Sequence, residues 1–328
     1  MPVAFLIGLG AGLVSAVLFA SASTGTMLGL FVLFLLSPLP VAIAGLGWGW
    51  RSAGAAAASG TALVMVAGTP RAAIFYFLAL GLPTAVLAHL ILLNRGVFAA
   101  LPGGTGSGIE WYPLGRIVTV AALWAGALAA LALLTTANDA EGLRAVLRET
   151  FDKVFVEHMR IPPVGMTVLG EQQIAAFAEV MVVSFAGSVA TIWMAVAILN
   201  LWLAGVVTRA SGRLVRPWPD LSAVTLPRSL PIAFALAIAL TIFLPTYASL
   251  IASGFASAFL FAFMLVGLAI IHHVTRGHGL RPAILSGVYV AIFVFNWLSG
   301  FVLAIIGLAE PFTSWRRRPP PSSSPPTT

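Results

Sequence analysis

Two long apolar stretches, residues 117–134 and 174–207, limit what this chain can fold into. The first has no charged residue and the second has one, and neither shows the polar–apolar alternation of a membrane β-strand. Backbone N–H and C=O groups inside a bilayer must pair within the protein, so a spanning chain is a helical bundle or a closed barrel. The stretches therefore predict an all-α polytopic membrane protein, folded as a helical bundle.

Composition supports this prediction. Of the 328 residues, 60% are hydrophobic and 8% are charged, whereas an average soluble domain has about 25% charged residues. A water-soluble protein could not cover so much apolar surface with so few charges. Soluble enzymes and nucleic-acid-binding proteins are excluded as classes despite the net charge of +7, and the expected environment is a lipid bilayer.

The number of spans follows from the length that crosses a bilayer, about 20 apolar residues. We expect about eight to ten membrane segments in one domain, residues 1–310. The candidate segments are residues 3–21, 27–50, 52–68, 72–93, 117–136, 174–207, 232–251, 255–271 and 282–308. Pro38 and Pro40 interrupt the second of them.

Three polar pieces separate or follow these segments. Residues 94–113 are rich in glycine and are expected to form a loop. In residues 137–172, apolar side chains recur at helical spacing with charges on the opposite face, which predicts an amphipathic insertion that is either a structural cap or a lid. Residues 311–328 are basic and then rich in proline and serine, which is typical of a disordered tail.

Arginine placement predicts orientation, because basic residues are enriched in cytoplasmic loops. Counting spans back from the arginines in residues 209–228 puts Arg51, Arg95 and Arg116 on the same side, with the N-terminus also in the cytoplasm of a bacterial inner membrane. Residues 316–318, all arginine, favour a cytoplasmic C-terminus, which nine full spans would not allow. Either residues 282–308 form a re-entrant hairpin that turns near Asn296, or the count is wrong by one around residues 38–40.

The first apolar segment has four small residues at four-residue spacing, Gly8, Gly12, Ala16 and Ala20. Such a face lets another helix backbone approach closely. One interpretation is packing inside this protein's own bundle, and the other is docking to a separate membrane partner.

Two resemblances extend this interpretation. The proline-then-small-residue pattern of residues 37–60 resembles the substrate-binding S components of energy-coupling-factor transporters over the first six spans. Residues 45–50 (GLGWGW) and 110–116 (EWYPLGR) resemble the YybS-like bacterial membrane proteins, a family without assigned activity that is distantly similar to those components. The S-component resemblance implies a membrane coupling subunit as partner, with the small-residue face of the first helix as its contact.

Three polar residues inside the apolar segments are candidate ligand-binding residues: Glu179, Asn200 and Asn296. An ionisable residue within a span is costly unless it is paired, protonated or facing a cavity, so Glu179 is either functional or extends to the outer interface. Asn200 and Asn296 fit a hydrogen bond between helices better than a ligand contact.

Patterns typical of catalysis or metal binding are weak. His272, His273 and His278 are close in sequence, but adjacent histidines face different sides of a helix and the ligand set is incomplete. The glycines of residues 103–108 lack the Lys-Ser/Thr ending of a phosphate-binding loop. We expect no catalytic residue, no metal, no cofactor and no enzymatic activity.

The function predicted from these features is a substrate-binding or transport subunit for a small, largely apolar solute. The alternative is a membrane scaffold or assembly factor without a ligand, and a lipid-modifying enzyme is disfavoured because no acid/base pair is recognisable. A cavity near Glu179 would support the first function, and a solid core would support the scaffold.

Overall fold

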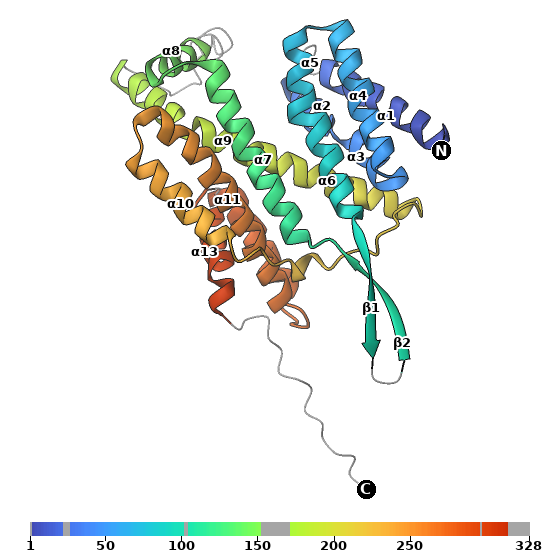
Figure 1. Ribbon diagram of the computed structural model, residues 1–328. Coiled ribbons are helices and arrows are strands. Elements are labelled where there is room, and N and C mark those ends of the chain that lie inside the picture. Colours follow the sequence, from blue (N-terminus) through green and yellow to red (C-terminus); the bar gives the residue numbers. More distant parts are fainter. Residues whose placement is uncertain (1, 22–26, 102–103, 152–170, 296, 314–328) are drawn as a thin grey trace.

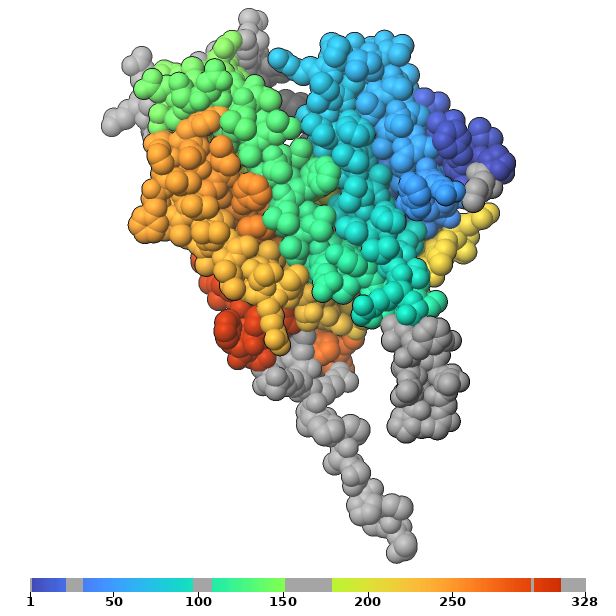
Figure 2. All heavy atoms as spheres, viewed as in Figure 1, coloured from blue at the N-terminus to red at the C-terminus, as the bar shows by residue number. Residues whose placement is uncertain are grey.

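The computed structural model describes residues 2–21, 27–101, 104–151, 171–295 and 297–313. Its helices form two groups, an N-terminal group from α1 to α6 and a C-terminal group from α7 to α13 (Figure 1). In the space-filling view the two groups meet along α6 and α7 (Figure 2). The long helix α9 contacts both groups, with α3 and α6 on one side and α7 and α11 on the other.

The N-terminal group contains two longer helices, α1 and α4, and several short helices that follow one another with little chain between them. Its elements are α1 (Pro2–Ser21), α2 (Met27–Leu36), α3 (Leu39–Trp48), α4 (Trp50–Ala67), α5 (Pro70–Tyr76), a π-helical turn (Phe77–Gly81) and α6 (Leu82–Leu92). Pro38 and Pro40 lack the N–H that would continue α2, so the segment divides there as expected. Gly49 has a φ of 89°, which lets the chain pass from α3 to α4 through one residue.

The π-helical turn follows from Pro83. A proline has no N–H to donate, and the Leu82 N–H bonds back to the Phe77 carbonyl, five residues away. Two tryptophans of the C-terminal group donate to carbonyls of this turn: Trp124 of α7 to Leu78, at 3.0 Å, and Trp193 of α9 to Ala79, at 2.6 Å. These two bonds tie the groups together at the turn.

Residues 94–111 form an antiparallel hairpin and not the loop expected from their glycines. Strand β1 (Asn94–Leu101) pairs with β2 (Gly104–Trp111), with Arg95 opposite Glu110. Arg95 and Glu110 also form an exposed ion pair at 2.7 Å. The hairpin projects from one end of the bundle (Figure 1).

The C-terminal group contains the longest helices. Its elements are α7 (Leu114–Thr136), α8 (Ala140–Phe151), α9 (Glu171–Ala210), a 3-10 turn (Leu221–Ala223), α10 (Leu230–Phe243), α11 (Thr246–Val274), α12 (Arg281–Phe295), α13 (Trp297–Ala309) and a second 3-10 turn (Glu310–Phe312). The break between α10 and α11 falls at Leu244 and Pro245, earlier than the predicted break at residues 252–254.

Helices α12 and α13 fold back on each other. The Ser299 hydroxyl donates to the Ala291 carbonyl at 2.7 Å, whereas eight residues of one continuous helix would separate them by about 12 Å. The break between the two helices falls between Phe295 and Trp297, and Asn296, where one of the two sequence alternatives placed the turn of a re-entrant hairpin, lies outside the described residues. Helix α13 packs on α11 with almost no space, because a Cβ on Gly267 would overlap the Leu303 carbonyl oxygen.

Five helices in the described part of the chain are long and apolar enough to cross a membrane. They are Pro2–Ser21, Pro70–Leu92, Leu114–Thr136, Glu179–Ala210 and Thr246–Val274, and shorter apolar helices lie beside them. The main core is rich in alanine: on α7, Ala121, Ala125 and Ala129 are fully buried at four-residue spacing. Small residues here bring α7 close to α9 and α11. The prediction of an all-α polytopic bundle is confirmed.

Candidate functional site

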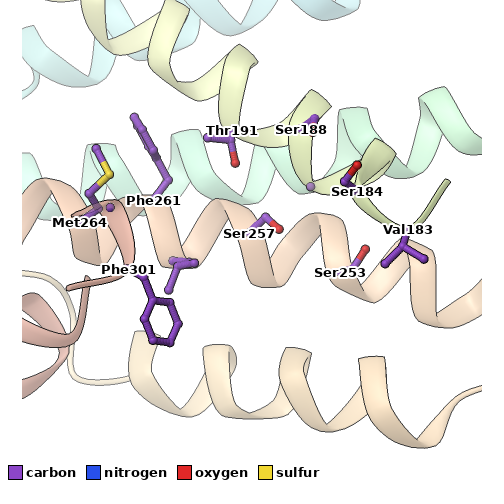
Figure 3. A pocket seen from close by; sticks show the side chains of 12 residues that line it. Val183, Ser184, Ser188, Thr191, Ser253, Ser257, Phe261, Met264 and Phe301 are labelled. Atoms are coloured by element: carbon purple, nitrogen blue, oxygen red, sulfur yellow. The ribbon is translucent and has the colours of Figure 1, made fainter. Parts of the chain in front are cut away.

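A groove of about 340 Å³ lies between α9, α11 and α13 (Figure 3). Five hydroxyl side chains line it: Ser184, Ser188 and Thr191 on α9, and Ser253 and Ser257 on α11. Leu260, Phe261, Met264 and Phe301 form its apolar wall. Among the described residues, no charged side chain lines this groove.

The hydroxyls of the groove differ in what they bond to. Ser184 donates to the Val180 carbonyl and Ser253 to the Leu250 carbonyl, both at 2.7 Å and both within their own helix. In the described structure, Ser188, Thr191 and Ser257 have no hydrogen-bond partner. In a membrane segment such hydroxyls are available to a ligand that can donate or accept a hydrogen bond.

Close packing of α9 on α11 sets the position of the groove. Gly187 faces Ser257 so closely that a Cβ on the glycine would lie 2.5 Å from the Ser257 Oγ. Gly254, one turn earlier on α11, packs in the same way on Ala129 and Ala186. The close crossing of α9 and α11 fixes the two rows of hydroxyls opposite each other.

Glu179 lies one turn before the groove begins at Val183, and its side chain is not buried by the rest of the protein. Its side chain is 51% exposed and pairs with Arg144 of α8, with the Arg144 Nε 2.8 Å from Oε2 and Nη2 3.0 Å from Oε1. Of the two interpretations of Glu179, the one in which its side chain extends to the interface fits this geometry, because α8 brings an arginine to it. Glu179 does not line the groove.

Helix α8, which carries Arg144 of this ion pair, is itself held in place by packing. Leu143 is fully buried and Leu147 is 7% exposed, and both belong to the main core. The Asp139 carboxylate accepts a hydrogen bond from the Gly142 N–H at 2.7 Å, which caps the start of α8. The described part of the amphipathic insertion therefore packs as a cap on the bundle.

Asn200 joins two helices. It is 1% exposed, and its Nδ2 donates to the Leu35 carbonyl of α2 at 2.7 Å and to the Val196 carbonyl at 2.8 Å. It lines neither the groove nor the cavity described below, and its Oδ1 has no partner in the described structure. The helix-to-helix interpretation fits this geometry. Asn296, the third candidate ligand residue, lies outside the described residues.

The small-residue face of α1 is covered by α4 of the same chain. A Cβ on Gly8 would overlap the Ser52 carbonyl oxygen, and a Cβ on Gly12 would overlap the Ala56 carbonyl oxygen. Ala16 is 1% exposed in a cluster with Tyr76, and Ala20 lies exposed near the end of the helix. Of the two interpretations of this face, packing inside the protein's own bundle fits this geometry better than docking to a partner, because three of the four residues are buried.

A second cavity, of about 400 Å³, lies nearer the hairpin end, and the sequence had not indicated it. Helix α9 contributes Ala195, Ile198, Leu199, Leu201, Trp202 and Gly205 to its wall. Other apolar residues come from α3, α6, α7, α11 and the segment after α9, which includes Trp218. Arg216 also borders this cavity, which we call the inner cavity.

Arg216 is anchored by the backbone. Its Nη1 donates to the Ile91 carbonyl at 2.9 Å and to the Tyr112 carbonyl at 3.2 Å, and its guanidinium lies 5.7 Å from the Trp111 ring centroid. Burial lowers the pKa of Arg216, but an arginine stays charged in proteins. The side chain ties the segment after α9 to the base of the hairpin.

Four more arginines stack on aromatic rings at distances of 5.2–5.9 Å to the centroid. The pairs are Arg51 with Trp50, Arg116 with Tyr112, Arg209 with Trp218, and Arg213 with Trp48. These pairs lie next to the hairpin, at helix ends and in the segment after α9. Their placement is typical of a membrane–water interface, where aromatic and basic side chains gather.

The histidines are not grouped as metal ligands. Within the described residues, no cluster of three metal-ligating side chains is present. Instead, the Nε2 of His272 lies 2.9 Å from the hydroxyl oxygen of Tyr289.

The sequence contained a signal for the groove, since Ser184, Ser188 and Thr191 recur at helical spacing in an apolar segment.

The comparisons with known proteins support the assignment to the membrane. A family described as predicted membrane protein (DUF2232) matches residues 13–310. No curated protein and no solved structure shows significant similarity to this chain. With a match over most of its length, the chain belongs to the DUF2232 family of predicted membrane proteins.

Proposed function

We propose that this membrane protein is a binding or transport subunit for a small, largely apolar solute, and that the groove between α9, α11 and α13 is its site. The observation that carries the proposal is a set of three hydroxyls, Ser188, Thr191 and Ser257, that face the groove and have no hydrogen-bond partner among the described residues. Polar groups inside a membrane protein are costly when they have no partner. A ligand that supplies partners offsets this cost.

The lining defines the class of solute. The volume of the groove, about 340 Å³, lies at the lower end of the range for small-molecule sites. Hydroxyls bind a neutral alcohol, carbonyl or ether group, and the walls formed by Leu260, Met264 and Phe301 accept an apolar body. The described lining has no cation or anion to compensate a charged ligand. We propose binding without covalent chemistry, so the protein is not an enzyme.

In the proposed orientation, the hairpin end faces the cytoplasm of a bacterial inner membrane, and both chain termini lie on that side. The five arginine–aromatic pairs support this assignment, because basic residues favour the cytoplasmic interface. Helix α13 also ends toward the hairpin end of the bundle (Figure 1). Fusions of a reporter that is active only in the periplasm, placed after Ala140 and after Thr328, test it: activity is expected only after Ala140, and activity after Thr328 would overturn it.

The alternative function is a scaffold or assembly factor without a ligand. The small-residue face of α1 was its main support, and α4 covers that face. The resemblance of residues 37–60 to S components supports a solute-binding subunit, although the face implied as the contact for a coupling partner is the same one that α4 covers. A solute-binding subunit is therefore the function that we propose.

The experiment is a mass-spectrometric search for small molecules that co-purify with the protein in lipid nanodiscs. The variants Thr191→Val and Ser257→Ala remove groove hydroxyls with little change of shape. Thr241→Val is the matched control, because the Thr241 hydroxyl donates to Ala237 within its own helix and lines neither cavity.

We expect wild type and Thr241→Val to retain one neutral, largely apolar molecule. Each groove variant should retain about five- to tenfold less, since a hydrogen bond contributes about 1 kcal/mol and 1.4 kcal/mol is a factor of ten. Finding only bulk lipids in wild type, or equal retention in all variants, would contradict the proposal.

A further inference from the structure

One face of α9 borders both the groove and the inner cavity. The residues of this face recur every three or four positions: Ser184, Ser188, Thr191, Ala195, Ile198 and Trp202. From Val183 in the groove to Gly205 in the inner cavity is 22 residues, or about 33 Å of helix. This length is close to the hydrocarbon thickness of a bilayer, about 30 Å. The two hollows thus follow each other along α9.

Helix α11 provides the facing wall in the same order. Ser253 and Ser257 line the groove, and Leu265 lines the inner cavity. Among the described residues, Phe261 alone borders both hollows. Its side chain, visible beside Met264 in Figure 3, therefore lies at the junction between them.

We propose that the inner cavity is a second binding site for an uncharged apolar molecule, and that Phe261 separates it from the groove on a single route along α9 and α11. This inference rests on the proposed function of the groove. The route would lead from the end of the bundle near Glu179 to the end that carries the hairpin.

The lining of the inner cavity fits this ligand class. Ile117, Val118, Ile198 and Leu265 contribute aliphatic surface, and Trp202 and Trp218 contribute rings. The guanidinium of Arg216 is engaged by two carbonyls and the Trp111 ring, so it stabilises the end of the cavity. An apolar molecule loses no hydrogen bonds on entering such walls.

The groove and the inner cavity differ in polarity, which gives the route a direction of increasing apolarity. Five hydroxyls line the groove, whereas the described lining of the inner cavity contains no serine or threonine. A molecule with one polar group would be held by that group in the groove and by its apolar body in the inner cavity. Phe261 then controls passage by its size, since an aromatic side chain fills the junction that both hollows share.

The test uses photolabelling of the full chain in lipid nanodiscs. The probe is a diazirine analogue of 1-octanol, and unlabelled 1-octanol is the competitor. Peptide mass spectrometry reads the label at Ser257 for the groove, at Ile198 and Leu265 for the inner cavity, and at exposed Ile232 of α10 as the lipid-facing control. Labelling that the competitor removes is site-specific, and labelling at Ile232 should not be removed.

Two variants change the junction. Phe261→Ala should raise the ratio of competitor-sensitive label in the inner cavity to that at Ser257 at least twofold, and Phe261→Trp should lower this ratio by a similar factor. The control is Phe255→Ala on the same helix, which borders neither hollow and should leave the ratio of the two labels unchanged. Thermal unfolding of each variant verifies that it is folded.

Each outcome separates the inference from the proposed function. Label at Ser257 without label in the inner cavity in every variant would overturn the second site and leave the groove standing. Inner-cavity label that does not respond to residue 261 would overturn the role of Phe261. Absence of competitor-sensitive label at both sites would overturn both proposals together.

Discussion

Two contact surfaces between helices, the seam between α1 and α4 and the seam between α9 and α11, contain the same kinds of residue but differ in how these residues are paired. Both contain small residues and hydroxyls on facing helices. Between α1 and α4, Ser52 donates to the Ala4 carbonyl at 2.9 Å and Ser59 to the Leu9 carbonyl at 3.0 Å. Between α9 and α11, Ser188, Thr191 and Ser257 face a groove and have no hydrogen-bond partner in the described part of the chain. The two seams therefore differ in whether their hydroxyls donate to a carbonyl of the facing helix: they do between α1 and α4, and those three do not between α9 and α11.

The largest expected effect comes from forcing a side chain into the seam between α1 and α4. Gly12→Leu should lower the free energy of unfolding by about 3 kcal/mol or more, because overpacking costs about 1–3 kcal/mol and here the nearest atoms are backbone. Gly10→Leu is the matched control, since a Cβ there meets nothing within 4 Å and should have little effect. Thermal or denaturant unfolding in detergent measures both, and equal destabilisation would break the contrast between the two faces of α1.

A smaller effect should distinguish a paired hydroxyl from the hydroxyls of the groove. Ser15 is fully buried, donates to the Ser37 carbonyl and accepts from the Tyr76 hydroxyl at 2.7 Å. Ser15→Ala should cost about 1–3 kcal/mol, because it leaves Tyr76 without its partner. Ser257→Ala should change the free energy of unfolding by less than about 0.5 kcal/mol. A similar loss in both variants would show that the groove hydroxyls also hold the fold together.

A weaker, pH-dependent effect is expected outside the membrane segments. Arg276 donates to Asp220 through two bonds of 2.7 and 2.5 Å, and these bonds, with those from Ser222, lower the pKa of Asp220. A carboxyl with a lowered pKa stabilises the fold above its ordinary pKa of about 3.9, and that contribution is lost as pH falls below this value. Unfolding curves between about pH 2 and 5 should show a smaller pH dependence for Asp220→Asn than for wild type. Identical curves would remove this ion pair from the account.

The smallest effect is expected at Glu179. Its ion pair with Arg144 is half exposed, and exposed pairs contribute little to stability. Glu179→Gln should insert normally and bind the solute as wild type does at every pH. Loss of binding, or a changed pH dependence between about pH 5 and 8, would instead connect Glu179 to the neighbouring groove.

Much of the fold could be predicted from the sequence because apolar length and proline position act locally. The division of the second apolar segment at residues 38–40 is an example. The hairpin of residues 94–111 was missed, since its glycines suggested a loop and no alternation of apolar residues marked strands. The break at Pro245 was misplaced because both flanking segments are apolar, so hydropathy alone did not locate the boundary.

The site was harder to predict than the fold. Glu179 and Asn200 were predicted as site residues because their side chains are polar within apolar segments. A charged side chain in such a segment can instead pair at the interface, as Glu179 does with Arg144. The groove depends on which faces of α9 and α11 meet, and this is a tertiary property. Phe261 carries no chemical signal at all, and only its place between two hollows distinguishes it from the other phenylalanines of α11.

We propose that the seam of α9 and α11 holds a ligand, whereas side chains of the protein itself fill the seam of α1 and α4. An experimental density map of the protein in nanodiscs, prepared without added ligand, tests this most directly. We expect density of a compact molecule within hydrogen-bonding distance of Thr191 and Ser257, and none between α1 and α4. A groove closed by its own side chains, or filled only by acyl chains like those on the exposed face of α10, would contradict it.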